Sequence, residues 1–515
     1  MAVTASSRRS RRALRRVRPT LLVRALSVCT VMAVVPSAHA VDWRLEPSLS
    51  ASAIYTDNVN QSAHDPNNAK IFQMMPGFTL YSTRASRLEA VLQYWLTAVS
   101  RLHPEDIEDT STSVLHRMNA AGHSELIEDF LFVEGSARIS QELISFEGPL
   151  APAEINDSNR AAVGTYSLSP HIKQRLGNLA LAQARYTASG AVFESNAAAN
   201  ATVNTFTADL TNGTAFRDVR WGLDYFLREA RNENTADTTF ERAVASFGYV
   251  LTRSFRLKGT VGEEWNDYPS VHETDGSSWS AGFGWSPGRR TRLEASVGER
   301  FFGDTYNLLF THRTRASTWH VRYDEDLSDL TQSMLSGGLN DYTCITADGV
   351  VMSYPNQPFD PSLMNPDLHG CTAADGTPSD LRNGVFIARS LRAGMTWGVG
   401  RLRYIVNAYE MQRDYQLADA EDRNRGVTAG IEHAAGPHTR VTGTLGYTNH
   451  VLPAVLSVNG VDRDDDVYLF TVGVLHQLDP TVLGSVTYQH QQRESNIASA
   501  DFTENRITAM VNMTF

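Results

Sequence analysis

Apolar and polar side chains alternate with a period of two along most of the chain after residue 40. Between residues 218 and 228 the odd positions are apolar and the even positions are mostly charged. The same alternation recurs in residues 88–98, 292–300 and 319–324. Successive side chains of a β-strand point to opposite faces of a sheet, so this period predicts strands rather than helices. No stretch after residue 40 is apolar for long enough to form a transmembrane helix.

The links between the predicted strands alternate in length. Short links lie at residues 83–86, 176–177, 252–254, 286–289, 398–400, 435–438 and 478–480. Long polar links lie at residues 58–69, 101–111, 144–158, 192–202, 231–238, 268–277, 328–382, 452–464 and 492–503. One link, at residues 302–305, is short where the alternation requires a long one. Short periplasmic turns and longer outer loops are typical of a transmembrane barrel.

These features predict an all-β protein: a single closed antiparallel transmembrane β-barrel of about 22 strands, within a range of 20–24, formed by residues 41–515. Closure is expected because an open sheet edge in lipid leaves backbone groups unpaired. The last predicted strand, residues 506–515, ends in the aromatic Phe515, which resembles the signal read by the barrel assembly machinery. The link 328–382 is expected to be a long extracellular insertion that folds over or into the mouth.

Residues 1–40 have the three parts of a secretory signal peptide. Eight arginines precede the apolar run from Ala25 to Val35, and Ala38 and Ala40 form a small-residue cleavage site. The run of eleven residues is too short to span a bilayer as a helix. The pair at residues 11–12 resembles a twin-arginine signal, but a barrel must stay unfolded for insertion, which favours a general basic segment. Cys29 lacks the preceding small residues of a lipoprotein signal.

The charge balance and the cysteines limit the partners of the mature chain. Loss of the signal peptide removes eight arginines and no acid, which changes the formal charge from −11 to −19. Nucleic acid is therefore not an expected partner, because phosphate binding needs a basic footprint. Cys344 and Cys371 both lie in the link 328–382, where an oxidising compartment would allow a disulfide. The sequence has no CxxC pair or HExxH helix, so no metal and no cofactor are expected.

Ten polar side chains on the clearest strands are candidates for the lumen face. Charged side chains at the middle of the bilayer are costly on the lipid face, so we expect the charged face to line the lumen and the face with Trp221, Tyr225, Trp319 and Tyr323 to meet lipid. Either these charges guide a polar solute, or they form ion pairs that stiffen the wall. The mixed signs argue against a strong charge filter. The candidates are Asp218, Arg220, Asp224, Arg228, Arg292, Glu294, Arg300, His320, Arg322 and Asp324.

Side chains that could serve an outer-membrane hydrolase are present, but none lies in a catalytic motif. Neither a G-x-S-x-G elbow nor an HExxH motif occurs, so we expect no enzyme activity and interpret the histidines as lumen or interface residues. The acidic residues at 462–466 lack the glycine and glutamate of an EF-hand and are interpreted as a solvated loop. The histidines are His312, His320, His433, His450, His476 and His490.

Residues 285–326 carry the most specific motif of the chain. Its centre is Gly298-Glu299-Arg300-Phe301-Phe302-Gly303-Asp304-Thr305-Tyr306, preceded by Trp285-Ser286-Pro287-Gly288-Arg289-Arg290 and followed by His312-Arg313-Thr314-Arg315 and Trp319. Further matching points are Tyr55-Thr56-Asp57-Asn58, Asn159-Arg160, Ser169-Pro170 and Arg185-Tyr186. With these residues, the sequence resembles the outer-membrane protein family associated with the PEP-CTERM/exosortase sorting system, which is related to β-barrel porins. The resemblance implies a Gram-negative outer-membrane barrel encoded beside exopolysaccharide synthesis and export machinery, and it brings no catalytic residues.

Three functions follow as expectations. The leading one is a porin-like outer-membrane conduit linked to exopolysaccharide export or surface assembly, because an unplugged lumen of this size would be a wide aqueous pore. The alternatives are a non-conducting scaffold that anchors partners through its loops, and an outer-membrane hydrolase. Expected partners are outer-membrane lipid, the barrel assembly machinery, and polysaccharide or periplasmic export components. An open lumen would favour the conduit, and a lumen closed by residues 328–382 would favour the scaffold.

Overall fold

A computed structural model describes residues 42–82, 87–102, 111–194, 198–233, 235–335, 340–346, 351–357, 368–374 and 381–515. In the three short ranges between 340 and 374 only the backbone is described. The expected signal peptide at residues 1–40 and its cleavage site lie outside the described residues.

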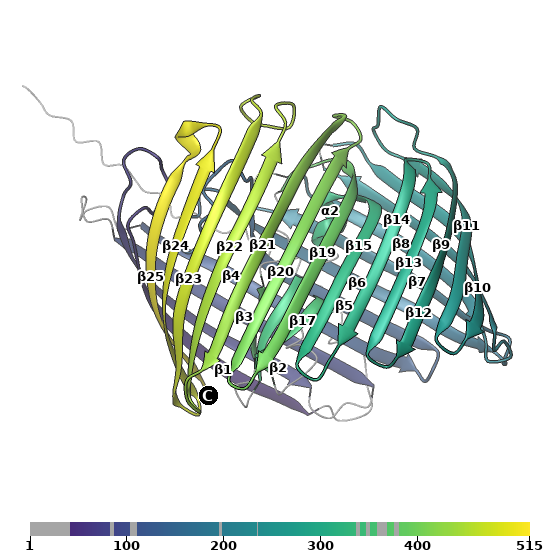
Figure 1. The fold of residues 1–515 in the computed structure, drawn as a ribbon, viewed down its shortest axis with the longest axis horizontal. Helices are drawn as coiled ribbons and strands as arrows, with labels where there is room; N and C mark the ends of the chain where they lie inside the picture. The colour runs from purple at the N-terminus through teal and green to yellow at the C-terminus, as the bar shows by residue number, and fades with distance from the viewer. Residues whose placement is uncertain are drawn as a thin grey trace, which may run out of the picture.

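Twenty-two strands form one antiparallel sheet that closes on itself, because β25 pairs with β1 (Figure 1). The predicted fold class and strand number are confirmed. In order around the barrel the strands are β1 (Trp43–Thr56), β2 (Ala69–Ser82), β3 (Leu88–Leu102), β4 (Ser111–Ile127), β5 (Leu131–Leu143), β6 (Arg160–Leu176), β7 (Ala180–Phe193), β8 (Ala201–Asn212), β9 (Val219–Asn232), β10 (Thr238–Thr252), β11 (Phe255–Asp267), β12 (Gly276–Gly288), β13 (Thr291–Arg300), β14 (Gly303–Arg313), β15 (Ser317–Asp329), β19 (Val385–Val399), β20 (Leu402–Tyr415), β21 (Ala420–Ala434), β22 (Thr439–Leu452), β23 (Arg463–Asp479), β24 (Val482–Ser495) and β25 (Phe502–Thr514).

The connections alternate between a turn end and a loop end of the barrel. Most links at the turn end are short, such as residues 177–179, 253–254 and 400–401, and the C-terminus lies at the same end (Figure 1). The loop end carries the longer links. The β13–β14 link there consists of only Phe301 and Phe302, and Gly303 follows with a φ of +114°, a conformation that glycine adopts without strain. The barrel is therefore notched at the loop end of β13 and β14.

The pairing register assigns side chains to the two faces of the wall. Leu223 of β9 lies opposite Ala245 of β10, and Trp221 lies opposite Phe247. Leu223 and Phe247 are 52% and 58% exposed, which marks this apolar face as the outer one. The alternate positions of β9, which include Arg220 and Asp224, face inward. The wall is thus apolar outside and polar inside.

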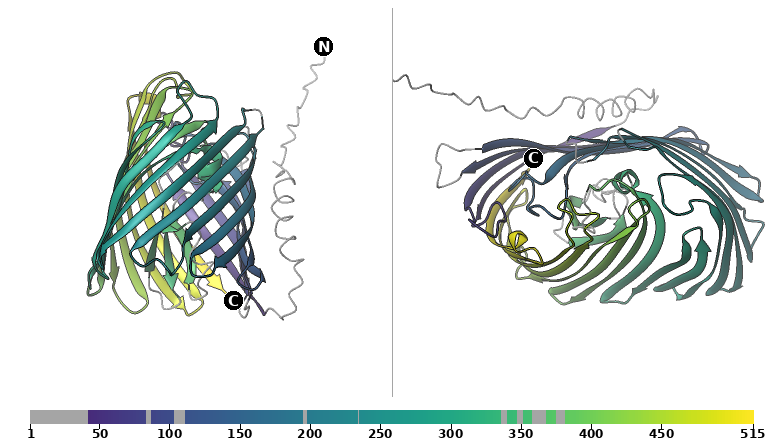
Figure 2. Two further views of the ribbon diagram at one scale, coloured as in Figure 1. Left: turned by 90° about the vertical axis from the view of Figure 1, so that its right-hand side faces the viewer. Right: turned by 90° about the horizontal axis from the view of Figure 1, so that it is seen from above.

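The chain between β15 and β19 forms an insertion, residues 330–384. It contains the short helix α2 (Leu330–Leu335) and a small sheet of β16 (Asn340–Thr346), β17 (Val351–Gln357) and β18 (Leu368–Ala374), with β16 in the middle. Seen from above, the ring of strands is elongated, and α2 and the small sheet lie within it (Figures 1 and 2). The described parts of the insertion therefore lie inside the barrel.

Candidate functional site in the barrel lumen

Nine of the ten predicted lumen residues lie on strands β9, β13 and β15. Asp218 instead lies in the turn before β9, which begins at Val219. The structure brings two pairs of the predicted residues together: Arg292 Nη2 lies 2.6 Å from Glu294 Oε1, and Arg322 Nε lies 2.7 Å from Asp324 Oδ1. In each pair, the two residues are two positions apart on the same face of the same strand.

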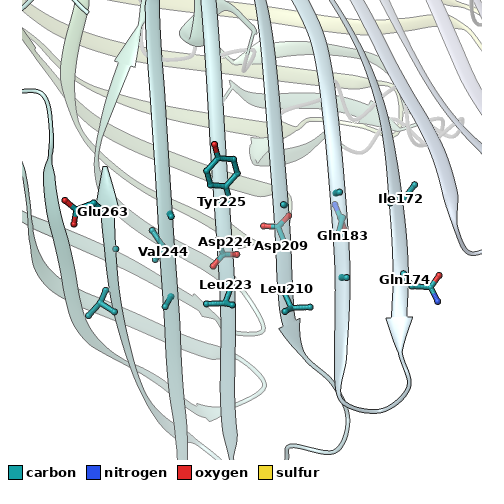
Figure 3. Close-up of a pocket in the computed structure, with 17 residues that line it drawn as sticks. Ile172, Gln174, Gln183, Asp209, Leu210, Leu223, Asp224, Tyr225, Val244 and Glu263 are labelled. Atoms are coloured by element: carbon teal, nitrogen blue, oxygen red, sulfur yellow. The ribbon is translucent and has the colours of Figure 1, made fainter. Parts of the chain in front are cut away.

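The other predicted residues have partners that the sequence pattern did not indicate. Arg300 Nε lies 2.6 Å from Glu264 of β11, and Arg300 Nη1 lies 2.9 Å from Asp326 of β15. Asp224 lies directly opposite Asp209 of β8, and Figure 3 shows the two carboxylates on adjacent strands. The imidazole of His320 lies against Gly394 of β19. A Cβ atom at residue 394 would lie 2.2 Å from the imidazole Cε1, so only glycine leaves room for this ring.

A buried ion pair joins two distant parts of the wall near the loop end. Arg228 of β9 donates two hydrogen bonds to Asp329 of β15, at 2.6 and 3.0 Å, and five strands separate β9 from β15 in the sheet. Asp329 Oδ1 also accepts the backbone N–H of Gln332 at 2.7 Å, so it caps the start of α2. One carboxylate thus fixes the wall and the start of the insertion together.

An apolar cluster fills the notch above the short β13–β14 hairpin. Its buried members are Phe240, Tyr268, Leu327, Val385 and Ile387, and Phe301 and Phe302 pack against them. The Tyr268 hydroxyl is buried without a hydrogen-bond partner among the described residues. Burial, reinforced by the negative charge of Glu264, raises the pKa of Tyr268 well above its usual value. The notch is therefore sealed by aromatic and aliphatic side chains.

The β5–β6 link, residues 144–159, also turns inward; we call it the inward loop. Its residues Ala151, Ala153 and Ile155 pack in a cluster with Ile71 of β2 and Val99 of β3. On the other side, its Phe146 ring lies 4.3 Å from the ring of His450 on β22. The inward loop therefore contacts the wall on both sides of the β1–β25 seam.

Buried arginines hold the backbone of the inward loop. Arg101 of β3 donates to the carbonyl oxygens of Ile155 and Ala153, at 2.9 and 2.6 Å. Arg493 of β24 donates to the carbonyl of Gly148 at 3.0 Å. Gln61, in the β1–β2 link, accepts the backbone N–H groups of Leu150 and Ala151 at 2.6 and 3.1 Å. These contacts give the loop one fixed position across the mouth.

The insertion is fastened to the wall opposite its origin. Leu330 of α2 and Leu381 pack with buried side chains of β6 and β7, among them Val163 and Phe193. The backbone N–H of Leu381 donates to the carbonyl of Ile144 at 3.2 Å. The segment leaves the wall at β15, reaches β6 and β7, and returns to β19, so it crosses the interior.

The predicted disulfide partners lie in the part of the insertion where only the backbone is described. The register of β16 and β18 aligns Cys344 with Cys371. Direct pairing of the two positions across adjacent strands agrees with the spacing that a disulfide requires, and the disulfide itself remains a prediction.

A hollow in the wall lies on the lipid-facing side and is not part of the lumen. It has a volume of about 850 Å³ and extends across β6 to β11 (Figure 3). Its apolar lining includes Leu210, Leu223 and Val261, which the register places on the outer face together with several alanines. Small side chains on the outer face therefore create this depression.

Two of the histidines that could serve a hydrolase contact threonine hydroxyls in the described part of the wall. His312 Nδ1 lies 2.8 Å from the hydroxyl of Thr291, and His476 Nδ1 lies 2.8 Å from that of Thr439. No group of three His, Cys, Asp or Glu side chains that could hold a metal occurs in the described part of the chain. No helix within the described ranges is long and apolar enough to cross a membrane.

The closed wall and its two faces define the class of protein. A sheet without edges, apolar outside and polar inside, meets the requirement that every backbone group be paired in lipid. This chain is a bacterial outer-membrane β-barrel, so the turn end faces the periplasm and the loop end faces the exterior.

Comparisons with known proteins find solved structures with a similar fold, but they do not assign the chain to a family. No family model and no curated protein matches the sequence. Among solved structures, the siderophore receptor PirA from Pseudomonas aeruginosa is 7% identical with a TM-score of 0.45, and the match covers 93% of this chain and 81% of that chain. The FrpB iron transporter from Neisseria meningitidis is 10% identical with a TM-score of 0.49, and the match covers 91% of this chain and 81% of that chain.

Proposed function

We propose that this barrel is a conduit for a polar solute, and that the insertion, residues 330–384, obstructs its lumen until it is displaced. The observation that supports this proposal is a closed wall of 22 strands that encloses charged side chains and a segment of its own chain. Barrels of this size are wide enough to hold a plug, and a lumen that holds one conducts only when the plug moves.

The resemblance to the outer-membrane family associated with the PEP-CTERM/exosortase system suggests an exopolysaccharide as the solute. The proposal is that the conduit serves exopolysaccharide export or surface assembly, with periplasmic export components as partners on the turn side. The barrel assembly machinery is the proposed partner during insertion, and outer-membrane lipid covers the outer face. The proposal assigns no catalytic step to the chain.

A non-conducting scaffold is the second candidate, and a specific observation favours it. The inward loop and the insertion both cross the interior, and Arg101, Arg493 and the Arg228–Asp329 pair fix their ends. If neither segment moves, the interior stays blocked and the loops serve only to anchor partners.

Single-channel conductance of the refolded mature protein in a planar bilayer tests the proposal. A matched variant replaces residues 336–380 with a short Gly/Ser linker; Met334 and Leu381 pack in the same cluster, so a short linker suffices. The conduit predicts rare or small openings for the intact protein and steady, larger openings for the variant. Silence in both, with folding shown by heat-modifiable gel migration, would leave the scaffold.

A further inference from the structure

The periplasmic rim of the barrel is basic over four consecutive turns. The turns before β9, β11, β13 and β15 contain Arg217, Arg253, Arg289, Arg290 and Arg315, and all five side chains are exposed. None of the five has an ion-pair partner within the described ranges, and Asp218 is the only acid in these turns. By contrast, the turn between β4 and β5 carries Glu128 and Asp129. The unpaired positive charge is therefore concentrated over these turns, and the exposed Arg401 extends it to the next turn, between β19 and β20.

The basic character continues from the rim into the lumen. Arg220, Arg256 and Arg292 are each the second residue of the strand that follows a basic turn. The register places Arg256 and Glu294 in one row across β11, β12 and β13, with Gly284 between them. This row alternates with outward Leu257 and Leu293, so it faces the interior.

Cations outnumber acids around Glu294. Arg256, Lys258 and Arg292 all contact the single carboxylate of Glu294; Lys258 Nζ lies 3.2 Å from it and Arg292 Nη2 lies 2.6 Å from it. The three cationic side chains are 41%, 34% and 55% exposed, whereas Glu294 is 13% exposed. Two of the three positive charges are therefore not neutralised, and all three remain accessible from the lumen.

Strand β12, which lies between these cations, has only small side chains on its inward face. The inward positions of β12 are Ser278, Ser280, Gly282 and Gly284. A Cβ atom on Gly284 would lie 2.5 Å from Arg256 Nε, so the glycine allows that side chain to lie across the sheet. A floor of small residues flanked by cations leaves room for a chain to lie against the wall.

We infer that the β9–β13 wall and its four basic turns form an entry site for a polyanionic chain that comes from the periplasm. This rests on the proposed function, because it names the charge of the cargo. An acidic periplasmic protein could use the exposed rim, but it would not need Arg220, Arg256 and Arg292 inside the wall. A polymer that enters the pore would contact both groups, so their continuity favours the polymer.

Equilibrium binding to the mature protein in nanodiscs tests the inference, with polygalacturonate as the polyanionic probe and dextran as the uncharged probe. The lumen variant carries Arg220→Gln, Arg256→Gln and Arg292→Gln, and the rim variant carries Arg217→Gln, Arg253→Gln, Arg289→Gln and Arg290→Gln. The control carries Arg403→Gln and Arg440→Gln, two cations that share Glu432 elsewhere on the wall. Heat-modifiable migration verifies the fold of each.

We expect polygalacturonate to bind and dextran not to bind. Each of the two variants should bind polygalacturonate at least about tenfold more weakly, and the control should change less than about twofold, because each lost charge-assisted contact contributes more than one factor of ten at most sites. The inference would be overturned if dextran bound equally well or if polygalacturonate did not bind. It would also be overturned if only the rim variant lost binding. That result would indicate docking on the surface of the rim. Binding by a barrel that never conducts would overturn the conduit and leave the polyanion site.

Discussion

Two sets of arginines line the same barrel and have opposite surroundings. At the loop end, Arg101 and Arg493 are buried and donate to backbone carbonyls of the inward loop. At the turn end, Arg253 and Arg290 are exposed and have no ion-pair partner among the described residues. A buried guanidinium must satisfy its donors within the protein, whereas an exposed one keeps them available for a ligand. The loop-end arginines therefore maintain structure, and the turn-end arginines are available for binding.

The same contrast separates the two ends of the lumen. At the loop end, the Arg228–Asp329 pair, the aromatic cluster and the inward loop fix segments across the interior. At the turn end the links are short, and the cations of β11 and β13 remain accessible. The structure thus combines fixed segments across the outer mouth with exposed cations on the wall near the turn end, which suits a barrel that accepts its cargo from the periplasm.

The largest effect is expected at the pair that fixes the insertion. Asp329→Ala leaves Arg228 as a buried, unpaired charge and removes the cap of α2, so it should lower the free energy of unfolding by about 3–5 kcal/mol. Urea unfolding in lipid vesicles, followed by tryptophan fluorescence, measures this. The double variant Arg228→Leu with Asp329→Leu should recover most of the loss, and a double variant as unstable as the single one would contradict the account.

A smaller effect is expected at the inward loop. Arg493→Ala leaves the carbonyls of Gly148 and Ala500 without this donor, so it should lower the free energy of unfolding by about 2–3 kcal/mol. It should also make the loop susceptible to proteolysis near Pro152, which is exposed. Limited proteolysis of intact vesicles checks this, and an uncleaved loop would show that the arginine does not hold it.

The exposed arginines should contribute little to stability. Arg253→Ala combined with Arg290→Ala removes no intramolecular ion pair among the described residues, so the free energy of unfolding should change by less than about 0.5 kcal/mol. The same urea titration measures it. A loss comparable to that of Arg493→Ala would remove the distinction between the two sets of arginines.

The smallest effect at neutral pH is expected at Tyr268. Its folded pKa is raised above the unfolded value near 10, so the stability linked to the protonated phenol is fully present below pH 10 and is lost as the pH rises above it. Because the buried hydroxyl has no hydrogen-bond partner among the described residues, Tyr268→Phe breaks no hydrogen bond among them and should not lower the free energy of unfolding at pH 7. Unfolding midpoints between pH 9 and 12 should fall less steeply for the variant than for the parent.

The wall of the barrel could be predicted from the sequence because it depends on local alternation. The period of two identifies strands without knowledge of distant residues, and so does the short link predicted at residues 302–305, which the structure places at Phe301 and Phe302. The direction of the loops could not be predicted in the same way. Arg228 and Asp329 are 101 residues apart, and nothing in the pattern around either residue names the other.

The candidate site was predicted only in part. The alternation of the strands predicts Arg220, Arg292 and Glu294 on the lumen face. The mixed signs of the ten predicted residues argue against a strong charge filter, but the unpaired arginines lie in the turns, outside the alternating strands. Alternating apolar residues at Ala151, Ala153 and Ile155 were the one local signal that the inward loop packs against the wall. Lys258 also lies in an alternating segment, but its contact with Glu294 joins residues 36 positions apart and cannot be identified from the local pattern.

The most direct test of the account is the reversal potential of the variant that lacks residues 336–380, measured in a planar bilayer with a salt gradient. The account predicts a conducting pore that prefers anions and that is blocked by polygalacturonate added on the periplasmic side, with both properties reduced by Arg220→Gln, Arg256→Gln and Arg292→Gln. A pore that prefers cations, or one that the polymer does not block from that side, would contradict it.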